Sequence, residues 1–177
     1  IIYYKIKYFS MSFTVAIVGR PNVGKSTFFN RLIGHKKSIV DDVSGVTRDR
    51  LYDVSEWNGK HFTVIDTGGF VNASQDIFEK EIKKQVELAI EEASCILFMT
   101  DATAGITDLD NQVAKLLRKI NKKVFLIANK VDNNQRYLQA QEMWGLGFDE
   151  LYCISSQSGS GTGELLDAVA TLIPEDN

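Results

Sequence analysis

Hydrophobic residues follow two different periods along the chain, and their alternation predicts strands and helices in turn. Short apolar runs rich in β-branched residues predict strands at residues 13–18, 61–65, 95–99, 124–128 and 151–154. Apolar residues spaced three and four apart predict helices at residues 25–33, 82–93, 113–120, 138–144 and 165–173. Strands that alternate with helices pair in parallel through crossover connections, which place helices on both faces of a sheet.

A hairpin is indicated by Asn58-Gly59, which separates a further strand at residues 51–57 from the strand at residues 61–65. It adds one antiparallel strand, which we expect at an edge of the sheet. The whole pattern predicts a three-layer α/β domain with a mostly parallel six-stranded sheet, one antiparallel edge strand and helices on both faces. In such sheets, ligands bind beyond the carboxyl ends of the strands.

The first ten residues do not fit this alternation. They lack the apolar core and the cleavage site of a signal peptide, and Met11 and Ser12 follow them like a natural start. We therefore expect residues 1–10 to be a leader that is not native to the domain, and residues 11–177 to form a single domain. The alternative is a genuine edge strand, because alternating aromatic and lysine residues suit one.

Composition narrows the class of protein. Hydrophobic residues make up 44% of the 177 residues, which excludes intrinsic disorder. The net charge of -3 argues against a domain whose main work is binding a polyanion. Cys95 and Cys153 are too few for a disulfide framework and lack metal-ligand spacing, so we expect two small buried side chains. No apolar stretch approaches the ~20 residues of a membrane span.

A phosphate-binding loop is indicated between the first strand and the first helix. The residues that match its pattern, with the threonine that follows, are Gly19, Arg20, Pro21, Asn22, Val23, Gly24, Lys25, Ser26 and Thr27. Glycines let backbone N–H groups surround an anion, and a helix N-terminus adds partial positive charge. Lys25 would reach the β- and γ-phosphates, and the Ser26 hydroxyl would bind Mg²⁺. The alternative is a glycine turn with a solvated lysine, which fits this strand–loop–helix context poorly.

A second phosphate-site motif, Asp66-Thr67-Gly68-Gly69, follows the strand at residues 61–65. An aspartate at a strand end beside the phosphate loop can hold Mg²⁺, usually through water. Gly69 can offer its backbone N–H to a γ-phosphate without an intruding side chain. Such a tetrapeptide also makes ordinary turns, but its position after the phosphate loop favours the metal role.

A guanine site is indicated where Asn129, Lys130 and Asp132 follow the strand at residues 124–128. The Asp132 carboxylate can accept two hydrogen bonds from guanine N1–H and N2–H₂, donors that adenine lacks. Asn129 would tie neighbouring loops together, and the Lys130 stem would cover one face of the ring. The residues expected to close the other side through backbone N–H groups are Ser155, Ser156 and Gln157. The alternative, a helix-capping turn, loses weight because two phosphate motifs come first.

With these motifs the chain resembles the translation-factor-like P-loop GTPases, and more narrowly the first GTPase domain of the EngA (Der) ribosome-assembly family. The motifs that carry the resemblance are residues 19–27, Gly45-Val46-Thr47-Arg48-Asp49-Arg50, Asp66-Thr67-Gly68-Gly69-Phe70 and Asn129-Lys130-Val131-Asp132. The resemblance covers residues 13–173. It implies a P-loop NTPase fold and a Mg²⁺-dependent GTPase, in which the hydroxyl of Thr47 joins the metal when GTP is bound.

The resemblance also implies a cellular setting. It implies a cytoplasmic protein, without membrane attachment, that acts on the large ribosomal subunit during assembly. Members of the family carry two GTPase domains in tandem and a KH-like third domain, whereas this chain has one GTPase domain. We therefore expect a piece of a longer protein. Ser156 stands where the family usually has alanine, an exchange that leaves the backbone contact intact.

The leading hypothesis is a GTPase that works as a conformational switch, with Asn22, Lys25, Thr47 and Gly69 as its catalytic residues. The alternative is a binding module that senses GTP or GDP with negligible turnover. Its support is Phe70, which stands where Ras-like GTPases place a water-orienting glutamine. A hydrophobic side chain cannot orient water, so intrinsic turnover should be slow.

A potassium ion is expected to supply the positive charge that Ras-like GTPases obtain from an arginine finger. The transition state of phosphoryl transfer carries negative charge at the β–γ bridge and the γ-oxygens. The side-chain carbonyl of Asn22 could bind a monovalent cation there, and the resemblance implies that related GTPases with this asparagine use K⁺ in the position of an arginine finger. The alternative is that Asn22 stabilises only the turn of the loop.

Overall fold

The computed structural model describes residues 12–34, 52–68 and 75–175. The leader expected at residues 1–10 lies outside these ranges. So do two of the predicted catalytic residues, Thr47 and Gly69, together with Phe70.

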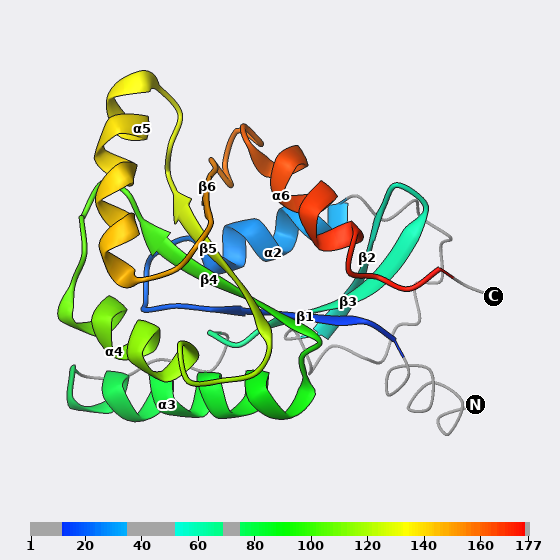
Figure 1. Cartoon of the computed structure of the whole chain (residues 1–177), viewed down its shortest axis with the longest axis horizontal. Coiled ribbons are helices and arrows are strands. Elements are labelled where there is room, and N and C mark those ends of the chain that lie inside the picture. Colours follow the sequence, from blue (N-terminus) through cyan, green and yellow to red (C-terminus); the bar gives the residue numbers. More distant parts are fainter. Residues whose placement is uncertain (1–11, 35–51, 69–74, 176–177) are drawn as a thin grey trace.

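A six-stranded sheet forms the centre of the domain, with the strand order β2-β3-β1-β4-β5-β6 (Figure 1). The five parallel strands are β1 (Thr14–Val18), β3 (Lys60–Asp66), β4 (Cys95–Asp101), β5 (Lys123–Asn129) and β6 (Leu151–Cys153). The edge strand β2 (Tyr52–Trp57) runs antiparallel to β3. The fold class predicted from the sequence is thereby confirmed, including the antiparallel edge strand.

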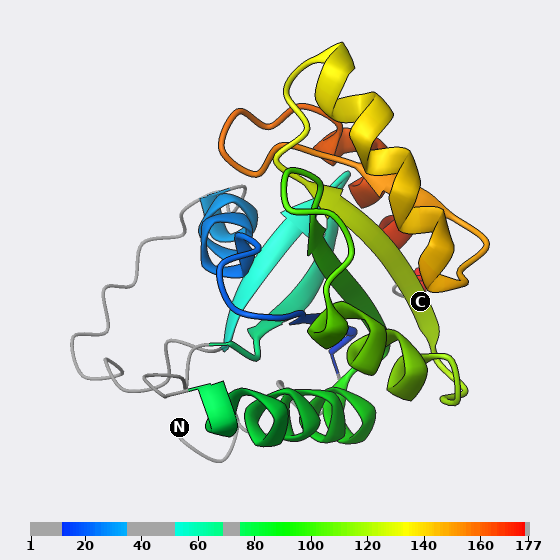
Figure 2. The same ribbon diagram turned by 90° about the vertical axis from the view of Figure 1, so that its left-hand side faces the viewer.

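Helices cover both faces of the sheet (Figure 2). One face carries α2 (Lys25–Gly34) and α6 (Thr162–Ala170), whose apolar side chains pack on it. The helices on the other face are α3 (Gln75–Glu92), α4 (Asp108–Leu117), α5 (Asn134–Ala140) and the 3₁₀ helix η1 (Gln141–Leu146). The predicted three-layer arrangement is therefore present.

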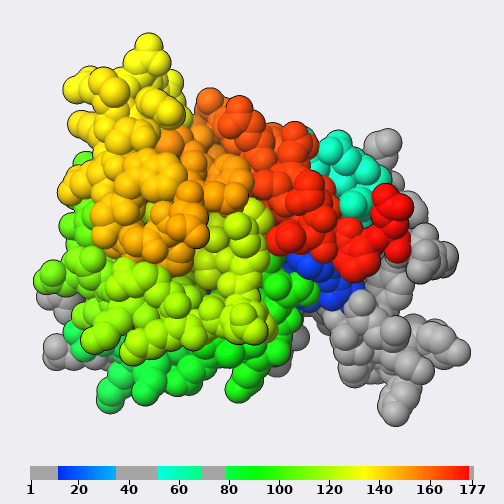
Figure 3. Space-filling model, in the orientation of Figure 1, coloured from blue at the N-terminus to red at the C-terminus, as the bar shows by residue number. Residues whose placement is uncertain are grey.

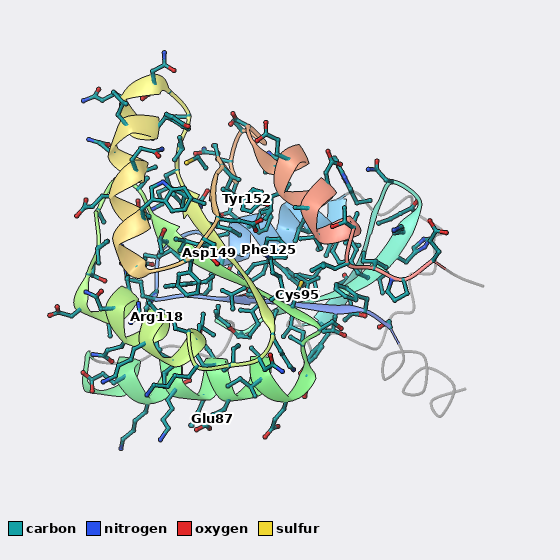
Figure 4. The ribbon with its side chains drawn as sticks, viewed as in Figure 1. Glu87, Cys95, Arg118, Phe125, Asp149 and Tyr152 are labelled. Carbon is teal, nitrogen blue, oxygen red and sulfur yellow. The ribbon has the colours of Figure 1, made fainter. Side chains whose placement is uncertain are left out.

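The core explains why the strands are apolar on both faces. In β1, Val15 and Ile17 pack under α2 and α6, while Ala16 and Val18 pack under α3 and α4, and all four are fully buried. This is the alternation expected when helices cover both sides of a parallel sheet. Towards the far edge, the rings of Phe125 and Tyr152 pack edge to face, 5.8 Å between centroids (Figure 4).

Several element boundaries differ from the sequence prediction. The helices predicted at residues 113–120 and 165–173 end at Leu117 and Ala170. Beyond these ends Ile120 and Ile173 still pack against the core, whereas Leu172 is exposed. The helix predicted at residues 138–144 begins earlier, because the Asn133 side chain accepts a hydrogen bond from the Arg136 N–H and caps α5. Its second half is the 3₁₀ helix η1. In the space-filling view α5 projects beyond β5 and α6 (Figure 3).

The two cysteines differ in environment. Cys95 is fully buried, and this burial raises the pKa of its thiol to about 12. Cys153 is only partly buried, so the expectation of two buried side chains is correct for one of them. No helix among the described ranges is long and apolar enough to cross a membrane.

Topology brings the candidate residues to one edge. The loops that follow β1, β3, β4 and β5 all leave the carboxyl ends of parallel strands, and β1 lies between β3 and β4. The hairpin lies at the opposite end of β2 and β3. There Asn58 and Gly59 have φ of 51° and 77°, the left-handed values that a two-residue turn of this kind requires.

Candidate functional site

The phosphate-binding loop connects β1 to α2, so that backbone N–H groups at the start of α2 are available to an anion. Two residues shape its turn: Asn22 has φ 66° and Gly24 has φ 101°. Asparagine tolerates this left-handed region, whereas at position 24 a Cβ would collide with the Asn129 side-chain amide. Gly24 is therefore required by both its backbone conformation and its neighbour.

Lys25 is a buried cation of this loop. Its side chain is buried, and its Nζ donates to the backbone carbonyls of Gly19 at 2.6 Å and Arg20 at 2.8 Å. A Cβ at position 68 would collide with the lysine stem, so Gly68 makes room for it. The ammonium is thus held at the loop by two neutral acceptors, which a phosphate oxygen can replace.

Burial lowers the pKa of Lys25 to about 8, Asp66 raises it in part, and the nearby Arg20 charge lowers it again. The lysine therefore sits in a place where a cation is poorly compensated. An anionic ligand would restore that compensation, since opposite charges at short range favour the charged form of both.

Asp66 and Ser26 form a pair of oxygen donors beside the lysine. The Ser26 hydroxyl donates to Asp66 Oδ2 at 3.2 Å, and Gly68 N–H donates to Asp66 Oδ1 at 3.1 Å. Adjacent ligands of an octahedral Mg²⁺ lie about 3 Å apart, and hydroxyl and carboxylate oxygens are its preferred donors. The two residues therefore fit a magnesium site. Among the described residues there is no group of three or more His, Cys, Asp or Glu side chains that could hold a metal ion.

The Thr67 side chain is buried and contacts two neighbouring elements. Its hydroxyl lies 2.6 Å from the carbonyl oxygen of Ile17 in β1 and 3.2 Å from Oε1 of the buried Gln85 in α3. The end of β3 is thereby tied to β1 on one side and to α3 on the other. This contact holds the strand end that carries Asp66.

Asn129 connects the phosphate loop to the loop after β6. Its Nδ2 donates to the Val23 carbonyl at 2.8 Å, and its Oδ1 accepts from the Ser156 N–H at 2.9 Å and the Ser156 hydroxyl at 3.0 Å. The side chain is 2% exposed, so each of these groups would be costly to leave unpaired. The expectation that Asn129 ties neighbouring loops together is confirmed.

Lys130 contacts the phosphate loop and the end of β4. Its backbone has φ 67°, and its Nζ donates to the Asn22 carbonyl at 3.0 Å and to Asp101 Oδ2 at 2.7 Å. Asp101 Oδ1 accepts from the N–H and the hydroxyl of Thr103. Burial alone would raise the pKa of Asp101, but the hydrogen bonds from Lys130 and Thr103 and the lysine charge hold it below its usual value.

Asp132 is exposed at the rim, where a ligand can reach it. Its Oδ1 accepts from the Asn133 amide at 3.2 Å and pairs with Arg136 at 3.3 Å, one helical turn further on. The Arg136 guanidinium lies 40% exposed and the Asp132 side chain 49% exposed, so this pair is weak in water. A guanine base would compete with it for the carboxylate.

The loop after β6 uses some of the N–H groups that were expected to face the base. Ser155 N–H donates to the Ser160 carbonyl, and Ser156 N–H donates to Asn129. Of the three residues predicted to close the site, Gln157 is the exposed one. Arg31 of α2 binds this loop through two hydrogen bonds. Its Nε donates to the Ser156 carbonyl at 2.6 Å, and its Nη2 donates to the Gln157 carbonyl at 2.7 Å.

Arg20 holds the phosphate loop from the other side. Its Nε lies 3.4 Å from the fully buried Asp110 carboxylate, which also accepts from the N–H and hydroxyl of Thr107 at the start of α4. The loop is thus connected to α4 by an ion pair.

The remaining residues of the predicted phosphate loop differ in exposure. Pro21 is half-buried, and Val23 is fully buried. Thr27 lies exposed in the first turn of α2.

The sequence analysis missed three side chains that hold the site: Arg31, Asp101 and Asp110. Each contacts a motif residue from a distant part of the chain, and none belongs to a motif. One signal was present in the sequence for Asp101, because it follows an apolar strand as Asn129 does. In the structure the two residues are paired in the register of β4 and β5. The described residues of the predicted site lie together at one edge, whereas Thr47 and Gly69 lie outside the described ranges.

Comparisons with known proteins agree with this arrangement. The chain is similar to proteins named GTPase Der, with 61% identity over 161 residues to the one from Christiangramia forsetii and 62% to the one from Flavobacterium johnsoniae. Each alignment covers 91% of this chain and 37% of the relative, so the chain spans little more than a third of the length of these relatives. The resemblance to the EngA (Der) family is confirmed by these matches.

Two solved structures of Era have the same fold. One, from Aquifex aeolicus and bound to GDP and AlF4⁻, matches with TM-score 0.71 and 31% identity, over 94% of this chain and 59% of that one. The other contains MgGDPNP and a segment of 16S ribosomal RNA, and matches with TM-score 0.70 and 31% identity, over 93% of this chain and 57% of that one. Residues 14–130, which include the phosphate loop and the first two residues of the guanine motif, Asn129 and Lys130, match the family described as 50S ribosome-binding GTPase. On this match, the chain belongs to the 50S ribosome-binding GTPase family.

Proposed function

We propose that this chain is a switch domain that binds guanine nucleotides and hydrolyses GTP to GDP and phosphate with Mg²⁺. The observation that carries the proposal is the convergence of Lys25, Asp66, Asn129 and Asp132 on the carboxyl edge of the sheet. The description of the matched relatives as GTPases favours hydrolysis over the alternative, a binding module with negligible turnover.

Base selection belongs to the loop after β5. Asp132 would accept from guanine N1–H and N2–H₂, and the pairing with Arg136 would open to admit the base. Asn129 would keep this loop in register with the phosphate loop through the Val23 carbonyl. The Lys130 stem would lie on one face of the base, since its ammonium is anchored at the Asn22 carbonyl.

Phosphate binding belongs to the loop after β1. The β- and γ-phosphate oxygens would replace the Gly19 and Arg20 carbonyls as acceptors for Lys25, and a charged acceptor strengthens that hydrogen bond. The hydroxyl of Ser26 and the carboxylate of Asp66 would hold Mg²⁺, which neutralises developing charge on the phosphates. Era solved with MgGDPNP supports magnesium as the ion.

We further propose that Thr47 and Gly69 respond to the γ-phosphate and that K⁺ bound by Asn22 accelerates hydrolysis. Support for the potassium site is the place of Asn22 on the phosphate loop, with an exposed side chain and a left-handed backbone conformation. The left-handed conformation is also what the alternative requires, in which Asn22 serves only the turn. The two readings differ in their consequences for turnover in different salts.

A ribosomal role is proposed for the longer protein. The family description, 50S ribosome-binding, supports the large subunit as the partner. The Era structure contains a segment of 16S ribosomal RNA, which belongs to the small subunit, and it supports a ribosomal role only in general. We propose that the longer protein acts on the large subunit during assembly, in the cytoplasm. Since this chain spans 37% of its relatives, we assign ribosome docking to the protein together with a second GTPase domain and a KH-like domain.

Turnover by the purified chain tests the proposal. We expect phosphate release from GTP in the presence of Mg²⁺, no comparable release from ATP, and a higher melting temperature with GDP because the ligand binds only the folded state. The Lys25→Met variant is the matched control for contaminating GTPases. GTP bound without phosphate release in any salt would favour the binding module, and equal use of ATP would refute the guanine assignment.

A further inference from the structure

We propose that Asp101 is a positioning residue of the nucleotide site, which holds the Lys130 ammonium against the phosphate loop so that the lysine stem is fixed where the base binds. The proposal rests on the proposed function, because it takes the surface beside Lys130 to be the site of the base. Asp101 is not part of the motifs that assign that site. It acts through Lys130 and would not touch the nucleotide itself.

Both carboxylate oxygens of Asp101 accept hydrogen bonds from neighbouring side chains or backbone. The residue ends β4 and pairs in register with Asn129, the residue immediately before Lys130. Its side chain is 8% exposed. One oxygen accepts from the Thr103 N–H at 2.8 Å and the Thr103 hydroxyl at 2.6 Å, and the other accepts from Lys130 at 2.7 Å. Thr103 therefore fixes the carboxylate, and the carboxylate fixes the lysine.

Lys130 needs such a partner because its side chain is long and partly in water. It is 39% exposed, and a lysine stem has four rotatable carbon–carbon bonds whose ordering costs entropy. The Asn22 carbonyl, 3.0 Å away, is a neutral acceptor, whereas a buried carboxylate makes a charge-assisted hydrogen bond that is stronger. Asp101 therefore restricts the ammonium to one position before the nucleotide arrives.

The arrangement also connects two parts of the site. Asn22 has a left-handed backbone, and its carbonyl receives the hydrogen bond from Lys130. A chain of contacts consequently runs from Thr103 through Asp101 and Lys130 to the turn of the phosphate loop. Because the lysine is ordered beforehand, the nucleotide does not bear the entropic cost of ordering it, which is the general advantage of a preorganised site.

A purely structural role for Asp101 is the competing explanation. The hydrogen bonds from Thr103 form a turn after β4, and a turn of this kind stabilises a loop whether or not Lys130 is present. The two explanations differ in one respect. A turn would act on stability independently of Lys130, whereas a positioning residue loses its effect on nucleotide affinity once the ammonium is gone.

The test is a double-mutant cycle on GDP affinity with Asp101→Asn and Lys130→Met, which keeps a stem and removes the ammonium. Asparagine keeps the shape but has one acceptor oxygen instead of two, so it can accept from Lys130 or from Thr103 but not from both. It also carries no charge, so the ion pair with the ammonium is lost in either orientation. Asp167→Asn is the control, because that carboxylate also accepts two side-chain hydrogen bonds, from Trp57 and Asn58, at the hairpin beside α6. Melting temperatures without nucleotide are measured in parallel.

We expect Asp101→Asn and Lys130→Met each to raise the Kd for GDP roughly tenfold, as for loss of one charge-assisted hydrogen bond, with the double variant no weaker than Lys130→Met alone. Asp167→Asn should leave the Kd unchanged. If Asp101→Asn does not fold, Thr103→Val replaces it in the cycle; it removes one hydrogen bond to the carboxylate, and about threefold is expected.

Three results would overturn the proposal: a GDP affinity of Asp101→Asn equal to that of Asp167→Asn, additive effects of the two substitutions, or a weakening of Thr103→Val that persists in the Lys130→Met background. These results differ from a failure of the proposed function. In that case the unsubstituted chain itself would fail to bind GDP, and no variant would be needed to show it.

Discussion

The Nε atom of Arg31 donates a hydrogen bond of 2.6 Å to the backbone carbonyl of Ser156, although 125 residues separate the two. A second hydrogen bond, 2.7 Å long, joins the same guanidinium to the Gln157 carbonyl. The helix that carries Arg31 begins at Lys25, in the phosphate loop. One helix therefore binds the loops at both ends of the nucleotide site.

Replacing Arg31 by lysine should loosen the loop after β6. A guanidinium donates to two carbonyls at once from a planar fork, whereas an ammonium is a single flexible point charge. We expect Arg31→Lys to raise the Kd for GDP roughly fivefold, corresponding to loss of about one hydrogen bond, in isothermal titration calorimetry. Asn30→Ala, at the exposed neighbouring position of α2, should leave the Kd unchanged. A similar Kd for both variants would contradict the role of Arg31.

The strand and helix order could be predicted because each element carries its own periodic signal. The turn at Asn58-Gly59 could be predicted from residue type, since a two-residue hairpin needs residues that adopt left-handed backbone values at those two positions. Boundaries such as the start of α5 were not predicted, because they depend on a single cap, the Asn133 side chain. Periodicity does not record such a cap.

The site was predictable as far as motifs reach. Lys25, Asp66 and Asn129 belong to short motifs, and the topology of a parallel sheet brings strand ends together. Arg31 and Asp101 belong to no motif and act through contacts with residues far away in the sequence, so the folded chain is needed to show what they contact. Sequence reasoning also assigned N–H groups of Ser155 and Ser156 to the base, although the fold already uses them.

Substituting Asp132 should change base preference. Because its carboxylate would accept from guanine N1–H and N2–H₂, Asp132→Asn should weaken GTP binding by roughly tenfold or more, the value of one charge-assisted hydrogen bond. The amide of the variant can donate to the 2-oxo group of xanthine, so xanthosine triphosphate should bind better than GTP. Competition binding with both nucleotides measures the switch.

Arg136 supplies the control for this experiment. Its ion pair with Asp132 is solvent-exposed, so Arg136→Gln should change GTP affinity by less than about threefold, in either direction, and keep the preference for guanine. An unchanged GTP preference in Asp132→Asn would refute the assignment of this carboxylate to the base.

Lys25 predicts a pH dependence of nucleotide binding. Its pKa is about 8 in the free protein, below the ordinary 10.5, mainly through burial. Phosphates favour the ammonium, so the pKa must rise in the complex, and binding above about pH 8 then takes up a proton. We expect GDP affinity to be insensitive to this group below pH 8 and to fall above it, by at most about tenfold per pH unit.

The lowered pKa of Lys25 affects the stability of the free protein in the opposite direction to nucleotide binding. Between about pH 8 and 10.5, without nucleotide, the unfolded chain binds more protons at Lys25 than the folded chain does. The contribution of Lys25 to the free energy of unfolding therefore rises with pH in that window. Calorimetry of GDP binding in buffers of different ionisation enthalpy reports the proton uptake directly. No uptake above pH 8 would show that Lys25 is already fully charged in the free protein.

The last prediction concerns the effect of potassium on the rate of GTP hydrolysis. The transition state gathers negative charge around the β–γ bridge, and Ras-like GTPases neutralise part of that charge with an arginine finger. The side-chain carbonyl of Asn22 cannot donate to phosphate, but it can bind a monovalent cation. We therefore expect GTP hydrolysis to be several-fold faster in KCl than in NaCl or LiCl, at about the same ionic strength.

Asn22→Ala separates this role from a role in the turn. If the cation acts through the side chain, the variant should lose the difference between K⁺ and Na⁺ and keep its GDP affinity to within about threefold, because its backbone still carries the carbonyl that Lys130 contacts. If Asn22 serves only the left-handed turn, the variant should keep whatever rate difference between K⁺ and Na⁺ the unsubstituted chain shows, because the strain of alanine at φ 66° would affect both salts equally. Equal rates of the unsubstituted chain in KCl and NaCl would reject the potassium mechanism while leaving the GTPase assignment intact.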